Sequence, residues 1–335
     1  MVEEITTYAP IMIPTLCRYE HLKSCLESLM LCVWAEKTEV YIALDYPVQK
    51  CHREGYFKID LYLQNIKNSH PFKKLHIIKR ARNYGLGVGG NGDTMRQELI
   101  KLYDRLIFSE DDNIFSPNFL VYMNKGLELF KEDKSVLAIN GYRHFYNIKY
   151  DNNTFFRQNV DFSAWGYGIW RDRIEQYSQL NHKWFAERLS LRTLLSLRKT
   201  NGNNRAMNFL SLAVKSSNQF SINDNVLSVY MALKNLNVIM PTVSLVRNMG
   251  VDGSGENFKK VRRGISEKHS QQIISLSLDF EYIGTGYEYY DYNREVYKFE
   301  SYGNYSNLLM IEKFFKHLIR YSFTKLKIAI NKQNG

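Results

Sequence analysis

Short apolar runs alternate with longer amphipathic segments along residues 8–140. The apolar runs are typical of buried strands and lie at 10–13, 40–44, 75–78, 105–108 and 136–140. The segments at 19–33, 55–67 and 119–130 repeat apolar side chains at helical spacing. Repeated strand–helix units predict an α/β fold, with a mostly parallel sheet and helices on both faces.

The second half of the chain is less regular. Residues 226–236 predict a helix and residues 238–245 a strand, whereas residues 161–174 mix glycine with large aromatic side chains. Segments of the latter kind often offer a flat apolar face to a sugar ring, and they pack into protein cores almost as often. Trp165 and Gly166 are therefore candidate contacts for a sugar.

One strand ends in three consecutive carboxylates. The apolar run 106–108 is followed at once by Glu110, Asp111 and Asp112. Adjacent anions repel one another, and a hard divalent cation is the usual reason to gather them at the end of a buried strand. Mg²⁺ and Mn²⁺ prefer carboxylate oxygens and keep positions open for substrate phosphates. A solvated acidic turn is the alternative, but the buried strand before the triplet favours a metal site.

Two other predicted strands also end in polar residues. Pro14, Thr15 and Arg18 follow the first strand, and Asp45 follows the second. Because ligands bind at the carboxyl ends of strands in such sheets, these residues should meet the acidic triplet at one edge. This convergence predicts a nucleotide-binding site.

A glycine-rich segment follows the third predicted strand. Gly85, Gly87 and Gly90 match the spacing of a dinucleotide-binding fingerprint, but they do not follow the first strand, where that fingerprint belongs. A dehydrogenase is therefore disfavoured. A mobile loop over a bound nucleotide donor, including Gly87, explains the glycines better. A second such loop is expected at 253–264, where glycine is combined with four cations.

The net charge of +11 indicates anionic partners: phosphates, nucleic acid or an acidic membrane surface. The basic and aromatic residues form no recognisable nucleic-acid module, so we expect no nucleic-acid partner. The first residues lack the features of a signal peptide, no apolar run is long enough to span a bilayer, and the four cysteines have no metal-ligand spacing. These observations favour a cytoplasmic protein with reduced cysteines.

Residues 307–335 combine apolar side chains near one helical face with many cations. Such a basic amphipathic helix can lie in an anionic membrane interface, which would place the protein at the inner face of the plasma membrane. The alternative is a terminal helix packed on the catalytic domain. We expect a catalytic domain at 1–265, with a nucleotide-binding part at about 8–145 and an acceptor part at about 146–265, followed by an extension at 266–335.

The order of these motifs resembles the GT-A glycosyltransferases, which have a Rossmann-like fold. The most similar patterns are those of an inverting N-acetylglucosaminyltransferase and of bacterial family-2-like sugar transferases. The matching segments are 11–18, the strand ending at Asp45, the acidic stretch 108–119, and Asp224 with 241–244. The resemblance implies a metal-dependent enzyme that transfers a hexosyl or N-acetylhexosaminyl group from a nucleotide-diphosphate sugar, a UDP-sugar by this likeness. The acceptor would be a glycan or a lipid-linked saccharide.

The resemblance also implies roles for single residues. Asp112 resembles the ligand of Mn²⁺ or Mg²⁺, and Asp45 the residue that meets the uracil ring. Glu110 and Asp111 resemble the residues that hold the ribose and sugar of the donor. Arg18 and Arg82 stand where the family places cations near the nucleotide.

Asp224 resembles the catalytic base, which would take the proton of the acceptor hydroxyl. The tryptophan and second acid of the family's base motif are absent, and two asparagines flank Asp224 instead. Asp224 also precedes a predicted helix, where an aspartate can serve only as an N-cap. Asp172 and Asp252 are the alternative bases.

Two other functions use similar features. A sugar nucleotidyltransferase would also bind a nucleotide and a metal, but it would carry a glycine-rich basic loop after its first strand, and residues 14–18 contain no glycine. A non-catalytic sugar-binding protein could keep the same fold without the chemistry. Hydrolysis of nucleotide sugars in the presence of Mn²⁺ would distinguish it from an active transferase.

Overall fold

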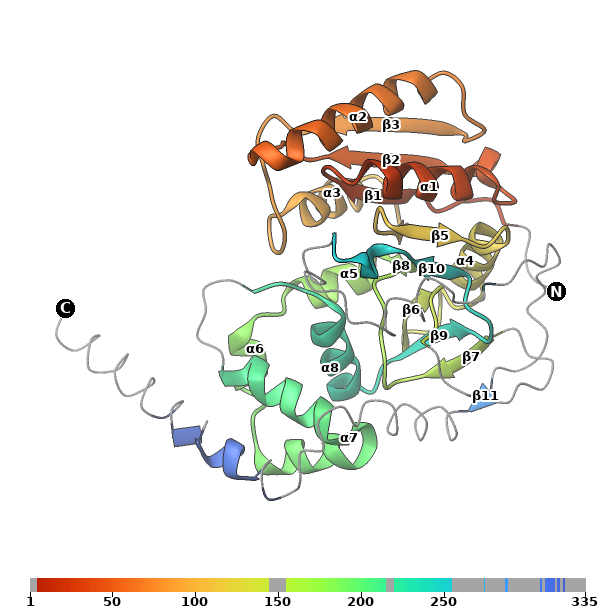
Figure 1. Cartoon of the computed structure of the whole chain (residues 1–335). Helices are drawn as coiled ribbons and strands as arrows, with labels where there is room; N and C mark the ends of the chain where they lie inside the picture. The colour runs from red at the N-terminus through yellow and green to blue at the C-terminus, as the bar shows by residue number, and fades with distance from the viewer. Residues whose placement is uncertain are drawn as a thin grey trace.

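The central feature of the computed structural model is a nine-stranded sheet (Figure 1). The structure describes residues 5–144, 155–214 and 220–254, with isolated positions at 274, 287–288, 308, 311–316, 318–319 and 322. Across the sheet the strands follow the order β3 (Lys74–Lys79), β2 (Glu39–Leu44), β1 (Ile11–Thr15), β4 (Arg105–Phe108), β8 (Tyr167–Trp170), β6 (Val136–Asn140), β9 (Asn237–Pro241), β7 (Phe155–Gln158) and β11 (Tyr287–Glu288). Strands β8, β7 and β11 run against the others. The predicted α/β fold with a mostly parallel sheet is confirmed.

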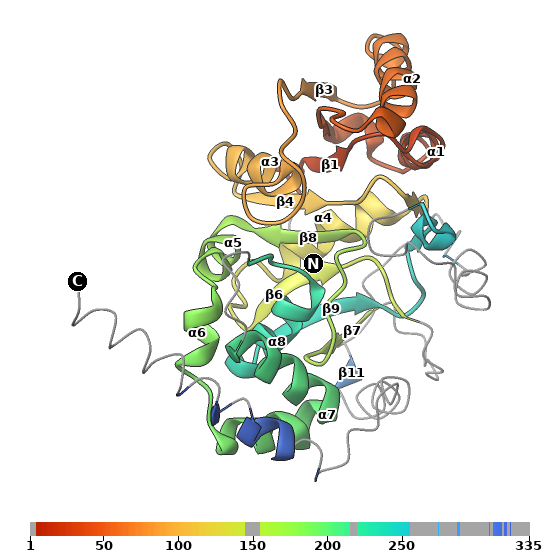
Figure 2. The ribbon, with the colours of Figure 1, turned by 60° about the vertical axis from the view of Figure 1, so that its left-hand side comes forward.

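Helices cover both faces of the sheet, as predicted (Figure 2). One face carries α1 (Tyr19–Met30), α2 (Lys50–Ile66) and α4 (Phe119–Leu129). The opposite face carries α3 (Asn91–Leu99), α5 (Arg171–Ser178), α6 (His182–Ala186), α7 (Leu191–Val214) and α8 (Asp224–Lys234). This arrangement is consistent with a GT-A-like fold.

Strand β1 shows why the strands read as continuous apolar runs. Ile11 and Ile13 pack in the core under α1, whereas Met12 packs in the core on the other face. A strand that is covered on both faces has no solvent-exposed side and so loses the alternation of an exposed strand. On α1, Cys25 is buried beside Leu22, and all four cysteines are free.

The aromatic segment 161–174 contains a strand that its sequence does not indicate. Strand β8 lies between β4 and β6 and is antiparallel to both. Gly168 pairs with both neighbours, and a Cβ at this position would lie 3.0 Å from a methyl group of Leu127. Part of this segment therefore packs in the core. Separately, the strand predicted at 238–245 ends earlier, at Pro241.

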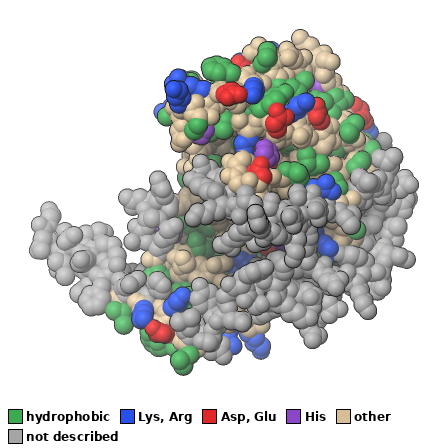
Figure 3. All heavy atoms as spheres, viewed as in Figure 1, with side chains coloured by type: hydrophobic (Ala, Val, Ile, Leu, Met, Phe, Trp, Pro, Cys, Tyr) green, Lys and Arg blue, Asp and Glu red, His purple; other side chains and the backbone are tan. Residues whose placement is uncertain are grey.

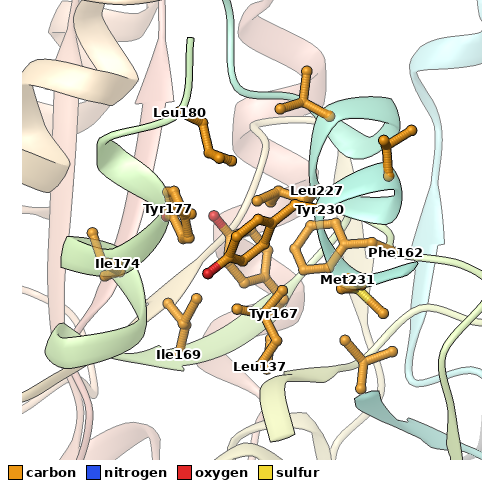
Figure 4. Packing of buried hydrophobic residues seen from close by; sticks show 14 of the residues in the cluster. Leu137, Phe162, Tyr167, Ile169, Ile174, Tyr177, Leu180, Leu227, Tyr230 and Met231 are labelled. Atoms are coloured by element: carbon orange, nitrogen blue, oxygen red, sulfur yellow. The ribbon is translucent and has the colours of Figure 1, made fainter. Parts of the chain in front are cut away.

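Helix α8 is anchored by a cluster of large side chains (Figure 4). Leu227 and Met231 of α8 belong to the same buried cluster as Tyr167 of β8 and Tyr177 of α5, and all four side chains are almost fully buried. Burial of each such side chain contributes about 1.5–3 kcal/mol. This packing holds the first residue of α8, Asp224, in a defined position.

Described residues of the expected extension contact the preceding part of the chain. Strand β11 pairs with β7, and Phe314 belongs to the buried cluster that contains side chains of α7 and α8, with 5% of its surface exposed. The described positions from 308 to 322 are helical. None of the described helices is long and apolar enough to cross a bilayer. The remainder of the predicted helix at 307–335 lies outside the described residues.

Candidate active site

The carboxyl ends of β1, β2 and β4 bring Thr15, Asp45 and the acidic triplet to one edge of the sheet. A small antiparallel pair, β5 (Asn113–Phe115) with β10 (Val246–Asn248), lies directly after the triplet. Helix α8 runs back along the sheet to β9, so its first turn reaches the same edge. The predicted convergence of these polar segments is thus present in the structure.

Asp111 and Asp112 are buried and surround the guanidinium group of Arg18. Arg18 donates from Nη2 to Asp111 Oδ1 and from Nη1 to Asp112 Oδ2, the latter over 2.6 Å. The other two carboxylate oxygens accept hydrogen bonds from Thr15 Oγ1 (2.7 Å) and Asn248 Nδ2 (2.6 Å). All four oxygens of the aspartate pair therefore have partners within the protein.

The pairing keeps Arg18 charged. Burial disfavours the guanidinium cation, but the carboxylates of Asp111 and Asp112 outweigh that effect and raise the pKa of Arg18. Burial raises the pKa of Asp111, and the charge of Arg18 opposes this shift. One cation at this point thus stabilises two adjacent buried anions.

Glu110 differs from its two neighbours. Its side chain is half-buried, and in the described part of the chain its carboxylate accepts no hydrogen bond. Burial, followed by the charges of Asp112 and Asp224, raises the pKa of Glu110 well above its ordinary value. The acidic triplet is therefore divided into a pair that shares the charge of Arg18 and a third carboxylate that interacts electrostatically with Asp224.

Asp224 is not the N-cap of α8. That position belongs to Asn223, whose side chain accepts the N–H of Val226 over 3.2 Å. Asp224 Oδ1 accepts the N–H of Ala164, in a distant loop, over 3.2 Å. Burial raises the pKa of Asp224 to about 6, although the N–H of Ala164 favours the ionised form. The capping hypothesis is wrong, and the position of Asp224 suits a base.

The two alternative bases have other partners. Asp172 lies at the opposite edge of the sheet, next to Trp170, which pairs with the first residue of β4, and it is bound to Arg173 and Lys134. Asp252 lies near the acidic triplet, but its carboxylate is bound by Ser254 over 2.6 Å and by His21 over 3.2 Å. Ion pairs and hydrogen bonds lower the pKa of both aspartates, although burial opposes them. Neither environment suits a base that works near neutral pH.

A histidine–aspartate pair lies beside Asp224, and no sequence motif marks it. His144 Nε2 lies 3.1 Å from Asp161 Oδ2, and both groups act electrostatically on Asp224. Tyr142 makes an edge-to-face contact with Trp165 at 4.6 Å between ring centroids and also contacts His144. Trp165 is half-buried, so part of its side chain remains accessible near Asp224.

Gly166 is buried, and packing accounts for its identity. Its φ is +78°, and a Cβ would lie 2.9 Å from Val246 Cγ2 and 3.2 Å from the ring of Phe119. Only glycine fits this conformation and this space without rearrangement. The predicted contact with an acceptor therefore rests on Trp165 rather than on Gly166.

Asp45 holds the glycine-rich loop in place. Its carboxylate accepts the backbone N–H groups of Tyr46, Tyr84 and Gly85, each over 2.9 Å, and the side-chain amide of Asn83 over 3.3 Å. A carboxylate offers about four acceptor positions, so these bonds use its capacity. The sequence did not indicate this anchoring role, and contact with a nucleotide base stays a prediction.

The loop reaches from Asp45 toward α8. Gly87 has a φ of +83° and lies against Ser221, just before Asp224. Arg82, at the start of the loop, is exposed over the ring of Tyr84 at 5.2 Å. Of the second predicted loop, 253–264, all but the first two residues lie outside the described ones.

The aspartate pair suits a hard cation, because such cations prefer carboxylate oxygens and one oxygen from each aspartate is directed at the same positive group. In this structure that positive group is Arg18. Within the described ranges, no group of three or more histidine, cysteine or acidic side chains is placed to hold a metal ion. Asp112 and Asp111 could hold a divalent cation only where Arg18 now lies.

Neither a family model nor a curated protein matches this sequence. Among solved structures, similarity is found to S. aureus TarS 1–349 at 12% identity, covering 65% of this chain and 58% of that one, with a TM-score of 0.34. It is also found to the mannosyltransferase PcManGT from Pyrobaculum calidifontis, in complex with GDP-Man and Mn²⁺, at 10% identity, covering 68% and 74%, with a TM-score of 0.36. This chain thus spans little more than half of the TarS chain, and TM-scores this low establish no shared family or activity.

Proposed function

We propose that this chain is an inverting glycosyltransferase that moves a sugar from a nucleotide-diphosphate donor, a UDP-sugar, to a hydroxyl group of a glycan or lipid-linked saccharide. The observation that supports this most is the position of Asp224. Its carboxylate, with a pKa raised to about 6, lies at the carboxyl edge of the sheet and acts electrostatically on Glu110 of the acidic triplet. A base near neutral pH next to a candidate nucleotide site suits attack by a hydroxyl group.

The reaction is a single displacement at the anomeric carbon of the donor. The acceptor oxygen attacks from the face opposite the diphosphate, and Asp224 takes its proton as the new bond forms. The N–H of Ala164 holds the carboxylate of Asp224 in place for the acceptor hydroxyl. Attack from one face with departure from the other inverts the configuration.

The departing nucleoside diphosphate must be stabilised as its charge grows. We assign Asp112, assisted by Asp111, as the residue that would hold Mn²⁺ or Mg²⁺. A bound cation of this kind would neutralise the diphosphate. Arg18 and Arg82 add positive charge, and Glu110 would accept hydrogen bonds from hydroxyl groups of the donor.

The acceptor would lie over Trp165, whose half-buried ring is next to Asp224 through the Ser163–Ala164 backbone. Aromatic faces suit the apolar side of a pyranose ring. Thr15 and Pro14 of β1 would close the donor side of the site, and Gly87 would lie over it next to Ser221. The site thus has a donor side on the first half of the sheet and an acceptor side beside α8.

We place the protein in the cytoplasm, attached peripherally to an anionic membrane. The described face of the last helix exposes apolar side chains, which are Leu308, Ile311, Phe315, Leu318 and Ile319. Acidic and basic side chains are interspersed over α1 and α2 on the face that Figure 3 shows, so the net charge of +11 is not gathered there. A lipid-linked acceptor would account for attachment at the membrane.

The test compares the same substitution, aspartate to asparagine, at Asp224 and at Asp172. The purified chain is incubated with UDP-sugars, Mn²⁺ and saccharide acceptors, and release of UDP is measured. Asp224→Asn should lower the rate by ~10²-fold or more while UDP binding is kept, because the base is lost and the shape is preserved. Asp172→Asn, at the opposite edge of the sheet, should leave the rate unchanged. Full activity of Asp224→Asn would remove the base assignment. Formation of UTP and a sugar 1-phosphate when pyrophosphate is added to the UDP-sugar, without release of UDP, would indicate a nucleotidyltransferase.

A further inference from the structure

Arg18 occupies the position between Asp111 and Asp112 where a divalent cation would bind. We propose that Arg18 and a divalent cation bind the aspartate pair alternately, so that Arg18 sets how tightly the chain holds metal before a donor arrives. This inference rests on the proposed function, because it concerns the same metal ligands. It adds a specificity-determining residue that limits metal binding by competition.

The geometry leaves space for one cation. A Cβ at Gly250 would lie 2.0 Å from Asp112 Oδ2 and 3.1 Å from Arg18 Nη1, so the backbone of Gly250 closes this side of the carboxylate. On the other side, Thr15 and Asn248 bind the remaining oxygens. These two neighbours hold the carboxylates in one orientation, with the inner oxygens toward Arg18.

The electrostatics also favour exclusive occupancy. Two buried, ionised aspartates without a positive partner are strongly unfavourable, so a cation at this position stabilises the pair. A guanidinium group and a divalent ion on the same two oxygens would repel each other at contact distance. Binding of one therefore requires departure of the other.

Arg18 is placed so that it can leave. It precedes α1 with a φ of −87° and a ψ of 74°, outside the regular helix, and 22% of its side chain is exposed. In the described part of the chain, the N–H groups that do not contact Asp111 and Asp112 have no protein acceptor. A guanidinium group has five donors in a planar fork that suits phosphate, so a displaced Arg18 could bind a diphosphate.

The test measures binding of Mn²⁺ alone, by calorimetry and by the loss of the free-ion electron paramagnetic resonance signal. Arg18→Gln removes the competing charge and should bind Mn²⁺ at least ~10-fold tighter than the wild-type chain, since charge-assisted hydrogen bonds no longer oppose the ion. Arg192→Gln is the matched control, because it removes the same charge from an exposed side chain on α7 that contacts neither aspartate. It should bind Mn²⁺ as the wild type does.

Two further variants make the result specific. Adding Asp112→Asn to Arg18→Gln should abolish the increase in Mn²⁺ affinity. This result would show that the ion binds at the aspartate pair and not at an unrelated surface site. Arg18→Lys keeps the positive charge but makes fewer contacts, and it serves if Arg18→Gln does not fold without metal. Its affinity for Mn²⁺ should be higher than that of the wild type and lower than that of Arg18→Gln. A larger rise in melting temperature on adding Mn²⁺ to Arg18→Gln than to the wild type would support the same conclusion.

Each contrary result has its own meaning. Equal Mn²⁺ affinity for the wild type, Arg18→Gln and Arg18→Lys would overturn the competition and leave the metal site and the proposed function intact. No Mn²⁺ binding to any variant would overturn it as well, and would show that the aspartate pair serves Arg18 alone. Sugar transfer in the presence of EDTA would then show whether the proposed function survives without metal.

Discussion

Glu110 and Asp224 interact electrostatically, although the two residues come from opposite halves of the chain. Burial is the largest cause of the raised pKa of Glu110, and the charges of Asp112 and Asp224 add to it. Glu110 follows β4 and Asp224 begins α8, so only the folded sheet brings the two side chains together. This proximity connects the acidic triplet to the proposed base, and it makes the pH dependence of the site informative.

The first prediction concerns the pH dependence of transfer. Asp224 must be ionised to accept a proton, and its pKa lies at about 6. The rate should therefore rise with pH through about pH 6 and level off above it. Values of kcat/KM for the acceptor measured from pH 4.5 to 8 would show this limb, because they report the ionisation of the free enzyme. A rate independent of pH between 5 and 7 would assign the proton to another group.

The second prediction concerns stability. The pKa of Asp224 is raised in the folded protein from 3.8 to about 6, so protonation favours the folded state. Its contribution to the free energy of unfolding is present below pH 3.8 and is lost as pH rises through about 6. At pH 7.5, Asp224→Asn should thus be more stable than the wild type, by about 1–3 kcal/mol. Urea unfolding of both proteins at pH 7.5 measures the difference, and a less stable variant would contradict the burial argument.

The third prediction concerns Gly166. Gly166→Ala should lower the free energy of unfolding by about 2–4 kcal/mol, because the methyl group meets Val246 and Phe119 and the left-handed backbone is strained. Gly89→Ala is the matched control, since its φ is +74° and nothing lies within 4 Å of a Cβ there. It should lose only about 1–2 kcal/mol. Equal losses in chemical denaturation would show that strain alone, and not packing, requires glycine at position 166.

Local patterns were sufficient to predict much of the fold. Strands such as β1 and β2 are buried on both faces, so their apolar runs were visible without any knowledge of their neighbours. Strand β8 was not visible, because Tyr167–Trp170 is short and interrupted by Gly168. It forms a strand only because β4 and β6 lie on either side of it, which is a long-range condition.

In the candidate site, too, some features were visible in the local sequence and others depend on contacts between distant segments. The acidic triplet stood out because three adjacent carboxylates are costly without a reason. The pairing of Arg18 with Asp111 and Asp112 depends on β1 and β4 being neighbours, which no local pattern reveals. The same is true of His144 and Asp161, since each is an ordinary residue in its own segment.

The last prediction concerns the membrane. The described helical positions between 308 and 322 divide into two sides, because Phe314 is 5% exposed in the core whereas Phe315 and Ile319 are 49% and 55% exposed. Lys313 and Lys316 lie on the same helical segment and would face anionic headgroups. Phe315→Glu with Ile319→Glu should weaken binding to vesicles of mixed neutral and anionic lipid by ~10-fold or more, since two apolar side chains are replaced by charges that the lipid repels.

Two controls separate this effect from unfolding. The double variant should keep the melting temperature of the wild type, because both side chains are exposed in the structure. Phe314→Ala should instead lower the free energy of unfolding by about 3–5 kcal/mol, because it removes a buried aromatic ring. Vesicle co-sedimentation in low and in high salt then tests the charge contribution. Unchanged binding of the double variant would show that this helix is only a packed terminal element, held to the domain by Phe314.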